Sequence, residues 1–172
     1  RPLIMVLAGM EREGVLVDEG YTKRLLGEYL ERGTQLVEQI KILLNSEKIR
    51  GQSLAVALEK MGAPIKERTP VLNLLKTDAE SLKEVKEWHP ELVEVLLEEK
   101  ENQKMRGYLE NFLELRGKDG RLHTSFNQAG GWEDTGDGKE APVTGRLSSS
   151  GPNLQTIPHH NDEQKAQAIR RC

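Results

Sequence analysis

The stretch DEGYTKRLLGEYLERGTQLVEQIKILL, residues 18–44, decides the fold class of this chain. Its apolar side chains recur mostly every third or fourth residue, and this spacing gathers them on one face of a helix. The face consists of Tyr21, Leu25, Leu26, Tyr29, Leu30, Leu36, Val37, Ile40, Leu43 and Leu44. Asp18 stands at a position typical of an N-cap, and Asn45-Ser46 suits a helix end. We therefore expect a long amphipathic helix over residues 19–44.

Further helices are expected after this stretch. A short helix follows and is closed by Gly62. Residues 63–77 contain two prolines and are expected to be a loop. Asp78 is a candidate N-cap of another short helix. Pro90, which suits a first helical turn, opens a second long helix over residues 90–115.

Each long helix has a segment that departs from the amphipathic pattern. Gly27 and Gly33 interrupt the first helix and weaken it by up to about 1 kcal/mol each relative to Ala, so its length needs tertiary support. Glu98–Lys104 of the second helix is wholly polar. We therefore expect the middle of that helix to face water or a partner.

The pattern changes after residues 117–120, which form a turn signal. In residues 121–128, RLHTSFNQ, three less polar side chains alternate with polar neighbours, which predicts a strand. A Gly-rich acidic loop follows over 129–140, and residues 141–158 are too irregular in composition for a core element. The predicted fold class is thus mainly α with a small β portion.

Composition excludes several classes of protein. The 172 residues carry 25 basic and 28 acidic side chains, which excludes a histone-like protein. The single cysteine, Cys172, excludes a disulfide framework and a cysteine-rich zinc site. The longest apolar run, such as Leu3–Ala8, is too short to span a membrane, so no membrane partner is expected. The start lacks an initiator Met and a signal-peptide pattern, and we expect a piece of something longer.

The near-neutral total conceals an uneven distribution of charge. Residues 41–77 carry seven basic and three acidic side chains, whereas residues 78–101 carry three basic and nine acidic ones. Charge asymmetry of this kind indicates a partner and says little about the fold.

The segment TGRLSSSGPNLQTIP, residues 144–158, is dense in hydrogen-bonding groups. It offers the guanidinium of Arg146, the hydroxyls of Ser148–Ser150, and the amides of Asn153 and Gln155. Such groups can donate to phosphate oxygens and to the acceptors that every base pair shows in the minor groove. The alternative is an ordinary polar surface loop.

This segment resembles the signature that precedes the first catalytic carboxylate motif of family A DNA polymerases. Three other segments add to the resemblance. DGRLHTSFNQ, residues 119–128, resembles the strand just upstream, and LAGMEREGVLVD, residues 7–18, resembles the segment that leads into the thumb. HPELVEVLLEEKENQK, residues 89–104, is similar to the helix that returns from the thumb tip. All four occur in the order of the family and cover essentially the whole chain.

The resemblance implies a thumb made of a long antiparallel helical hairpin with a helical tip, followed by short strands of the palm base. Residues 1–17 would be the palm edge that leads into the thumb. Residues 18–116 would be the helical thumb, with its tip at about 45–77 facing phosphates. Residues 117–172 would be the N-terminal palm segment, with an inserted loop at 130–143.

The resemblance also implies which residues contact DNA. Arg146 would reach the minor groove at the primer terminus, Asn153 and Gln155 would touch the duplex near the nascent pair, and Lys104 would meet the backbone. The full set of expected DNA-binding residues is Arg146, Asn153, Gln155, Lys104, Ser148, Ser149, Thr156, Asn127, Gln128, Lys48 and Arg50.

Some of these residues are less well supported by the family pattern. Lys48, Arg50 and also Lys76 are candidate phosphate contacts at the tip, and ordinary solvated basic side chains are the alternative. The usual Lys-x-x-Ser-Thr-Tyr of the family is here Lys104-Met-Arg-Gly-Tyr108, which lacks the Ser-Thr pair. The hydroxyl contacts of that pair are therefore not expected.

The activity that the resemblance implies is DNA-directed DNA synthesis with two metal ions held by palm aspartates. The motifs that carry them, Asp-Tyr-Ser-x-x-Glu-Leu-Arg and a later His-Asp-Glu, do not occur in these 172 residues. We therefore expect no catalytic residue, no metal site and no cofactor in this chain, and no polymerase activity from it alone. Mg²⁺ and dNTPs are expected for the complete polymerase.

The expected partners are a primer–template duplex and the remainder of the polymerase, fingers and catalytic palm, in cis or in trans. The expected localisation is the cytoplasm of a bacterial or phage-infected cell. The alternative is a stand-alone helical-hairpin adaptor or split-polymerase subunit that acts through a protein partner. The acidic stretch 78–101 and the loop 130–143 favour that alternative.

Overall fold

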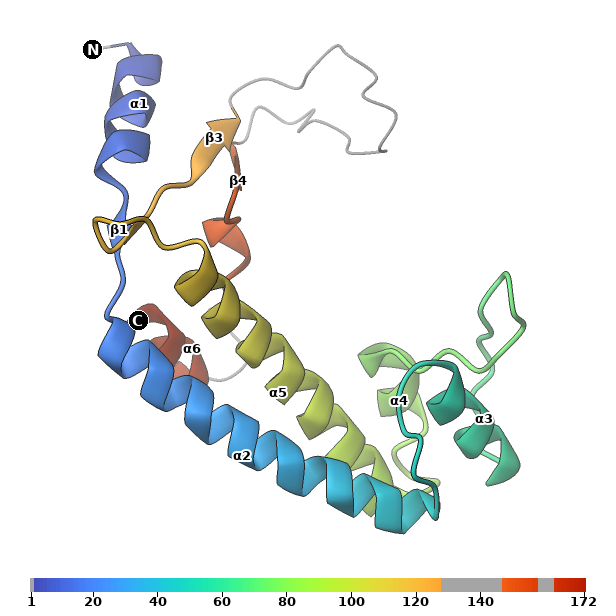
Figure 1. Ribbon diagram of the computed structural model, residues 1–172. Coiled ribbons are helices and arrows are strands. Elements are labelled where there is room, and N and C mark those ends of the chain that lie inside the picture. The colour runs from blue at the N-terminus through green and yellow to red at the C-terminus, as the bar shows by residue number, and fades with distance from the viewer. Residues whose placement is uncertain (1, 128–146, 158–162) are drawn as a thin grey trace. The chain divides into compact units, whose positions relative to one another are not determined.

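The computed structural model describes residues 2–127, 147–157 and 163–172, with the side chains of 163–166 left aside. Its elements, shown in Figure 1, are α1 Leu3–Glu13, β1 Val15–Leu16, α2 Glu19–Leu44, α3 Gln52–Lys60, α4 Ala79–Glu84, α5 Pro90–Glu114, β2 Arg121–Leu122, β3 Ser125–Asn127, β4 Ser148–Ser150, the 3₁₀ helix η1 Leu154–Thr156 and α6 Glu163–Arg170. The fold is mainly helical with a few short antiparallel strands, as the sequence predicts.

The ends of the helices follow from local hydrogen bonding. The Asp18 carboxylate accepts a hydrogen bond from the backbone N–H of Tyr21 at 2.9 Å, and the Asp78 carboxylate accepts one from Ser81 at 2.8 Å. Both predicted N-caps are thus confirmed. α2 ends just before Asn45, whose φ of 45° is the left-handed conformation that commonly terminates a helix.

The chain forms two compact units. The first, called here the helical unit, is residues 27–106 and holds most of α2 and α5 together with α3 and α4. The second, called the strand unit, is residues 1–26 and 107–172 and holds the strands, α1, η1 and α6.

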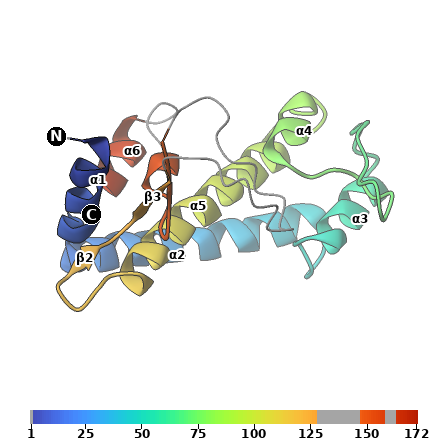
Figure 2. The ribbon, with the colours of Figure 1, turned by 90° about the horizontal axis from the view of Figure 1, so that it is seen from above.

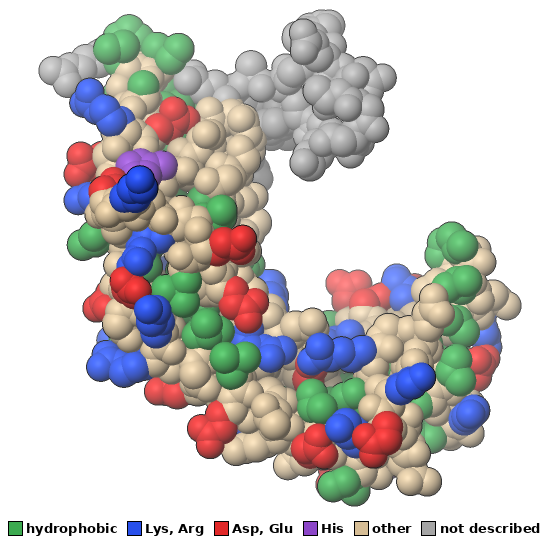
Figure 3. Space-filling model, viewed as in Figure 1, with side chains coloured by type: hydrophobic (Ala, Val, Ile, Leu, Met, Phe, Trp, Pro, Cys, Tyr) green, Lys and Arg blue, Asp and Glu red, His purple; other side chains and the backbone are tan. Residues whose placement is uncertain are grey.

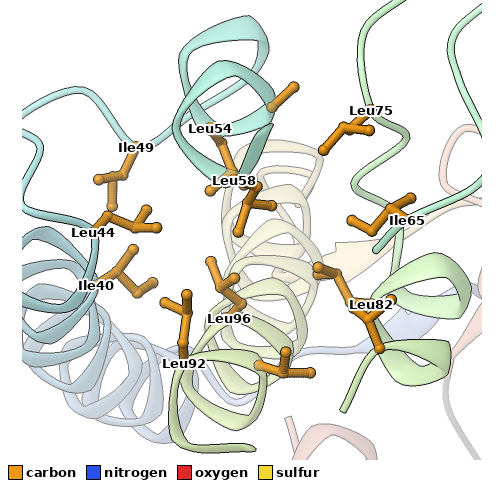
Figure 4. Packing of buried hydrophobic residues seen from close by; sticks show 13 residues of the cluster. Ile40, Leu44, Ile49, Leu54, Leu58, Ile65, Leu75, Leu82, Leu92 and Leu96 are labelled. Carbon is orange, nitrogen blue, oxygen red and sulfur yellow. The ribbon is translucent and has the colours of Figure 1, made fainter. Parts of the chain in front are cut away.

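The helical unit is built around one cluster of buried apolar side chains. In Figure 4 the side chains from α2, α3, α4 and α5 point toward one another in this cluster. Ile65 and Leu75, at the two ends of the predicted loop, are also buried in it, so the loop is tied to the core at both ends. The cluster consists of Ile40, Leu44, Ile49, Leu54, Ala55, Leu58, Ile65, Leu75, Leu82, Val85, Leu92, Val93 and Leu96.

Within the helical unit α2 and α5 run antiparallel and side by side (Figures 1 and 2). Arg32 of α2 forms two hydrogen bonds to the Glu98 carboxylate, at 2.7 and 2.9 Å. Asn102 of α5 is only 4% exposed, and a Cβ added to Gly33 would lie 2.9 Å from its Oδ1. The prediction that residues 98–104 face water or a partner is therefore wrong at Asn102, because Gly33 lets α2 cover it.

The strand unit contains two antiparallel strand pairs. β1 pairs with β2, with Val15 opposite Leu122, and β3 pairs with β4, with Phe126 opposite Ser149. The C-terminal end of the chain, just after α6, contacts the start of α2 (Figure 1), where the backbone N–H of Asp18 donates to the Cys172 carbonyl at 2.5 Å. These contacts join segments that are far apart in the sequence.

The strand predictions need two corrections. The expected strand over 121–128 is interrupted at residues 123–124, which separate β2 from β3. The segment 141–158 was expected to be too irregular for a core element, yet it supplies β4, and Ser149 is 4% exposed. The sequence does not predict this strand, because three consecutive serines lack the alternation of apolar and polar side chains that indicates a strand.

The sequence analysis did not predict α1 or α6. In α1 only Leu7 is buried, while Leu3, Ile4 and Met5 are each more than half exposed. Figure 3 shows these hydrophobic side chains gathered at the N-terminal end of α1. Because the apolar residues surround the helix, no single buried face is visible in the sequence.

The two glycines of α2 are expected to respond in opposite ways to substitution by alanine. Gly33→Ala places a Cβ 2.9 Å from Asn102 Oδ1 and should destabilise the helical unit by about 1–3 kcal/mol. Gly27→Ala is the matched control, because nothing lies within 4 Å of an added Cβ there. That control should gain up to about 1 kcal/mol from helix propensity alone. Thermal unfolding followed by circular dichroism measures both, and equal stabilisation by the two substitutions would contradict the close contact.

Candidate nucleic-acid interface

Residues 147–157 form a polar segment of the strand unit. They comprise β4, a turn with a cis Gly151–Pro152 peptide, and η1. The side chains of Asn153, Gln155 and Thr156 are exposed. The segment therefore presents amides and a hydroxyl to the surface from an ordered backbone.

Asn153 caps η1 and uses its amide oxygen to do so. Oδ1 accepts a hydrogen bond from the backbone N–H of Gln155 at 3.0 Å and one from the Ser149 hydroxyl at 3.1 Å. An amide oxygen has two lone pairs, so both are engaged within the protein. No acceptor for its NH₂ group lies among the described residues, so this donor is the part of the exposed side chain that remains for a ligand.

Gln155 and Thr156 are held by bonds within the same segment. The Gln155 side-chain NH₂ donates to the Leu147 carbonyl at 3.0 Å. Within the described ranges its second N–H and its amide oxygen have no further partner and remain for a ligand. The Thr156 hydroxyl donates to the Asn153 carbonyl at 2.9 Å. Both side chains are therefore restrained at the surface.

The structure brings together only part of the predicted site. The predicted residues that lie in the strand unit, close to the β3–β4 pair and η1, are Asn127, Ser148, Ser149, Asn153, Gln155 and Thr156. Those in the helical unit are Lys48, Arg50 and Lys104. Arg146, Gln128 and the loop 130–143 lie outside the described residues.

Sequence reasoning missed a residue that holds the segment in place. The Tyr108 hydroxyl donates to the Thr156 carbonyl at 2.6 Å and so anchors η1 to the C-terminal part of α5. One signal in the sequence could have pointed to Tyr108. It is the residue of the family pattern that is kept after Lys104, although the Ser-Thr pair before it is missing.

The basic stretch 41–77 is partly neutralised by ion pairs inside the helical unit. Arg68 contacts Glu59 at 2.7 Å and Lys76 contacts Glu67 at 2.6 Å. Hydrogen bonds to Glu67 and then to Asp78 raise the pKa of Lys76 above its ordinary value. From the sequence alone, both cations would be expected to be available for phosphates. In the structure each is already paired with a carboxylate.

Two of the predicted phosphate contacts at the tip differ in their surroundings. Arg50 lies 3.5 Å from the carboxylate of Glu99. Lys48 is exposed, forms no ion pair among the described residues, and lines an open surface pocket of about 480 Å³ with Ser46 and Lys60. Of these two cations, Lys48 is the one without a competing carboxylate.

The acidic stretch 78–101 also finds partners within the helical unit. Glu98 pairs with Arg32, and Glu94 pairs with Lys86 at 2.8 Å. These pairs consume charge that could attract a basic protein partner. They therefore give no support to the adaptor alternative.

A histidine clasp holds the turn before β3. His123 Nδ1 lies 2.8 Å from the Glu11 carbonyl oxygen, and Nε2 lies 2.9 Å from the Asp119 carboxylate. Both partners are acceptors, so only the imidazolium, with a proton on each nitrogen, satisfies both. The Glu11 carbonyl and then Asp119 raise the pKa of His123, and His123 lowers the pKa of Asp119. The Glu11 carboxylate also accepts from the Phe126 N–H at 2.6 Å, so the clasp adjoins β3.

Among residues 2–127, 147–157 and 163–172, no group of three or more His, Cys, Asp or Glu side chains is placed to hold a metal ion. None of its helices is both long and apolar enough to cross a bilayer.

Comparison with known proteins gives consistent matches. The family model of DNA polymerase family A matches residues 21–172. The chain is 37% identical over 166 residues to "DNA polymerase I, thermostable" of Thermus aquaticus, across 92% of this chain and 18% of that protein. It is 34% identical over 163 residues to DNA polymerase I of Helicobacter pylori strain J99, across 91% of this chain and 16% of that protein. It therefore spans less than a fifth of the length of these relatives.

A solved structure is similar over almost the whole chain. The POL domain of Pol1 from M. smegmatis, in complex with DNA primer-template and dNTP, superimposes with a TM-score of 0.79 at 26% identity. The similarity covers 95% of this chain and 27% of that one.

The His123 clasp predicts a pH dependence of stability. Because the folded pKa of His123 is raised, its contribution is complete below the unfolded value of about 6.5 and is lost as the pH rises through the folded pKa. The melting temperature should therefore fall as the pH rises from about 6.5 through the raised folded pKa of His123. His123→Gln and Asp119→Asn should each flatten this fall, and an unchanged pH profile in both variants would contradict the clasp.

Proposed function

The chain belongs to DNA polymerase family A, and we propose that it is the part of a DNA polymerase that grips the primer–template duplex. The observation that carries this proposal is the exposed Asn153 amide, whose oxygen is engaged internally and whose NH₂ group is left to donate. The similar solved domain of M. smegmatis is a complex with DNA primer-template, which supports the same partner here.

A donor amide suits the minor groove of any sequence. Every base pair shows acceptors there, at N3 of purines and O2 of pyrimidines. An Asn153 side chain that offers only N–H groups can bond to these acceptors at each pair, and the remaining N–H of Gln155 can do the same. Such contacts respond to the shape of a pair without reading its identity, as template-directed synthesis in replication or repair requires.

Exposed cations would supply the contacts to the sugar–phosphate backbone. Lys48 and Lys104 are exposed and form no ion pair among the described residues, so they can approach phosphates without breaking an internal contact. Arg50 would exchange Glu99 for a phosphate. Arg146 and Gln128, which lie outside the described residues, are proposed contacts on the resemblance alone.

We assign residues 18–116 to the thumb, with the tip at about 45–77, and residues 117–172 to the first part of the palm. Residues 1–17 would form the palm edge. Fingers and the catalytic part of the palm, in cis or in trans, would supply the aspartates, Mg²⁺ and dNTP site. The relatives are bacterial, so the parent enzyme is proposed to act in the cytoplasm of a bacterial or phage-infected cell.

Because the catalytic groups are proposed to lie in other parts of the polymerase, we expect that this chain alone does not extend a primer. The purified 172 residues, given a primer–template, Mg²⁺ and all four dNTPs, should yield no product longer than the primer on a denaturing gel. DNA polymerase I of Thermus aquaticus serves as the positive control. Extension by the chain alone would place catalytic residues within it and contradict the assignment.

Duplex binding tests the role of Asn153. Asn153→Asp retains the oxygen acceptor for Gln155 and Ser149 but replaces the donor with a negative charge. Loss of a hydrogen bond and repulsion from phosphates should weaken binding to a primer–template by about tenfold or more. Fluorescence anisotropy of a labelled duplex measures the affinity.

The matched control is Asn111→Asp, which adds the same charge at an exposed position on α5. It should lower affinity much less than Asn153→Asp. Wild-type affinity should also fall steeply with salt, because phosphate contacts release counterions. Equal effects of the two substitutions, or affinity independent of salt, would contradict the proposed interface.

A further inference from the structure

We propose that Thr124 is a positioning residue for the duplex contact, and this proposal rests on the proposed function. Thr124 lies between β2 and β3 and is only 6% exposed. Its hydroxyl oxygen lies 2.6 Å from the Pro152 carbonyl oxygen and 3.1 Å from the Ser150 carbonyl oxygen. The side chain thus reaches the turn that precedes Asn153.

The hydrogen-bonding capacity of a hydroxyl explains why this contact constrains the turn. Thr124 has one proton to donate, and two carbonyls of the same turn converge on it. The shorter distance assigns the stronger bond to Pro152. Because the site is buried, water cannot easily replace this donor, and a side chain without a hydroxyl would leave both carbonyls poorly satisfied.

The bond to Pro152 fixes the peptide that leads into Asn153. The carbonyl of Pro152 and the N–H of Asn153 belong to one planar peptide unit, so holding the oxygen holds the plane. Asn153 must keep that orientation for its Oδ1 to accept from Gln155 and Ser149. If the plane turns, the amide oxygen is released and the NH₂ group no longer has a fixed direction.

Thr124 does not touch the proposed ligand, which distinguishes it from the contact residues. Thr124 holds the backbone of the turn, and the turn fixes the orientation of the Asn153 side chain. Two substitutions separate the hydroxyl from the shape of the side chain. Thr124→Val keeps the shape and removes the donor, whereas Thr124→Ser keeps the donor and removes a methyl group.

The first test needs no DNA and follows the Gln155 backbone N–H, which donates to Asn153 Oδ1. Hydrogen exchange by NMR should show this proton exchanging at least about tenfold faster in Thr124→Val, because its acceptor is no longer held. Thr124→Ser should exchange as wild type does. Thr22→Val is the matched control, since Thr22 is fully buried in the same unit and its hydroxyl donates to the Asp18 carbonyl at 2.7 Å. That control should leave Gln155 exchange unchanged.

The second test measures binding of the same variants to a labelled primer–template. Thr124→Val should weaken binding several-fold, whereas Thr124→Ser and Thr22→Val should bind as wild type does. In a double variant, Thr124→Val should weaken binding little beyond the effect of Asn153→Asp, because both substitutions act on one contact. Unchanged Gln155 exchange in Thr124→Val, or fast exchange in Thr124→Ser, would overturn the positioning role. Where the valine variant does not fold, Thr124→Ala takes its place, since it also lacks the hydroxyl and should show the same fast Gln155 exchange.

The two tests separate the failure of this inference from the failure of the proposed function. A wild-type chain that does not bind the duplex, with fast Gln155 exchange in Thr124→Val, contradicts the duplex contact and leaves the positioning of Asn153 intact. A wild-type chain that binds, with Thr124→Val binding equally well, contradicts the positioning role and leaves the duplex contact intact.

Discussion

The candidate interface depends on side chains that form hydrogen bonds to the backbone of residues 147–157, a segment with little regular structure. Only β4 pairs with a neighbouring strand. Beyond it, Thr124 and Tyr108 donate to carbonyls of the segment, and the Asn153 side chain accepts from the backbone N–H of Gln155. The same bonds that order the backbone also decide which atoms remain for a ligand. An amide whose oxygen is used internally can present only donors, and this selects a partner that offers acceptors.

The helical unit meets a different constraint, because about half of its charged side chains form ion pairs within the unit. Arg32 with Glu98 and Arg68 with Glu59 are partly exposed pairs, each of which contributes little to stability. Their main effect is on the charge left for a partner. Lys48 is exposed and has no carboxylate partner among the described residues, whereas other cations of the unit are paired. The count of basic residues alone therefore overstates the number of cations available to a phosphate backbone.

Local signals predicted the helices of the helical unit, whereas α1, α6 and the long-range contacts were not predicted. Asp18 and Asp78 cap helices as expected because capping involves residues only three positions apart. The burial of Asn102 depends on Gly33, on another helix, and no local pattern reveals it. In the site, Asn153 and Gln155 could be identified by resemblance, since the family motif contains them. The function of Thr124 could not, because its partners Ser150 and Pro152 lie in a segment whose strand the sequence concealed.

The central claim is that the Asn153 NH₂ group faces a DNA duplex, and NMR can observe that group directly. The measurement is a titration of the ¹⁵N-labelled chain with a primer–template, following the side-chain NH₂ signals of its asparagines. We expect the Asn153 signals to shift or broaden with added duplex, while those of Asn111, exposed on α5, change far less. Asn153 signals that stay unchanged while the duplex binds elsewhere on the chain would contradict the claim.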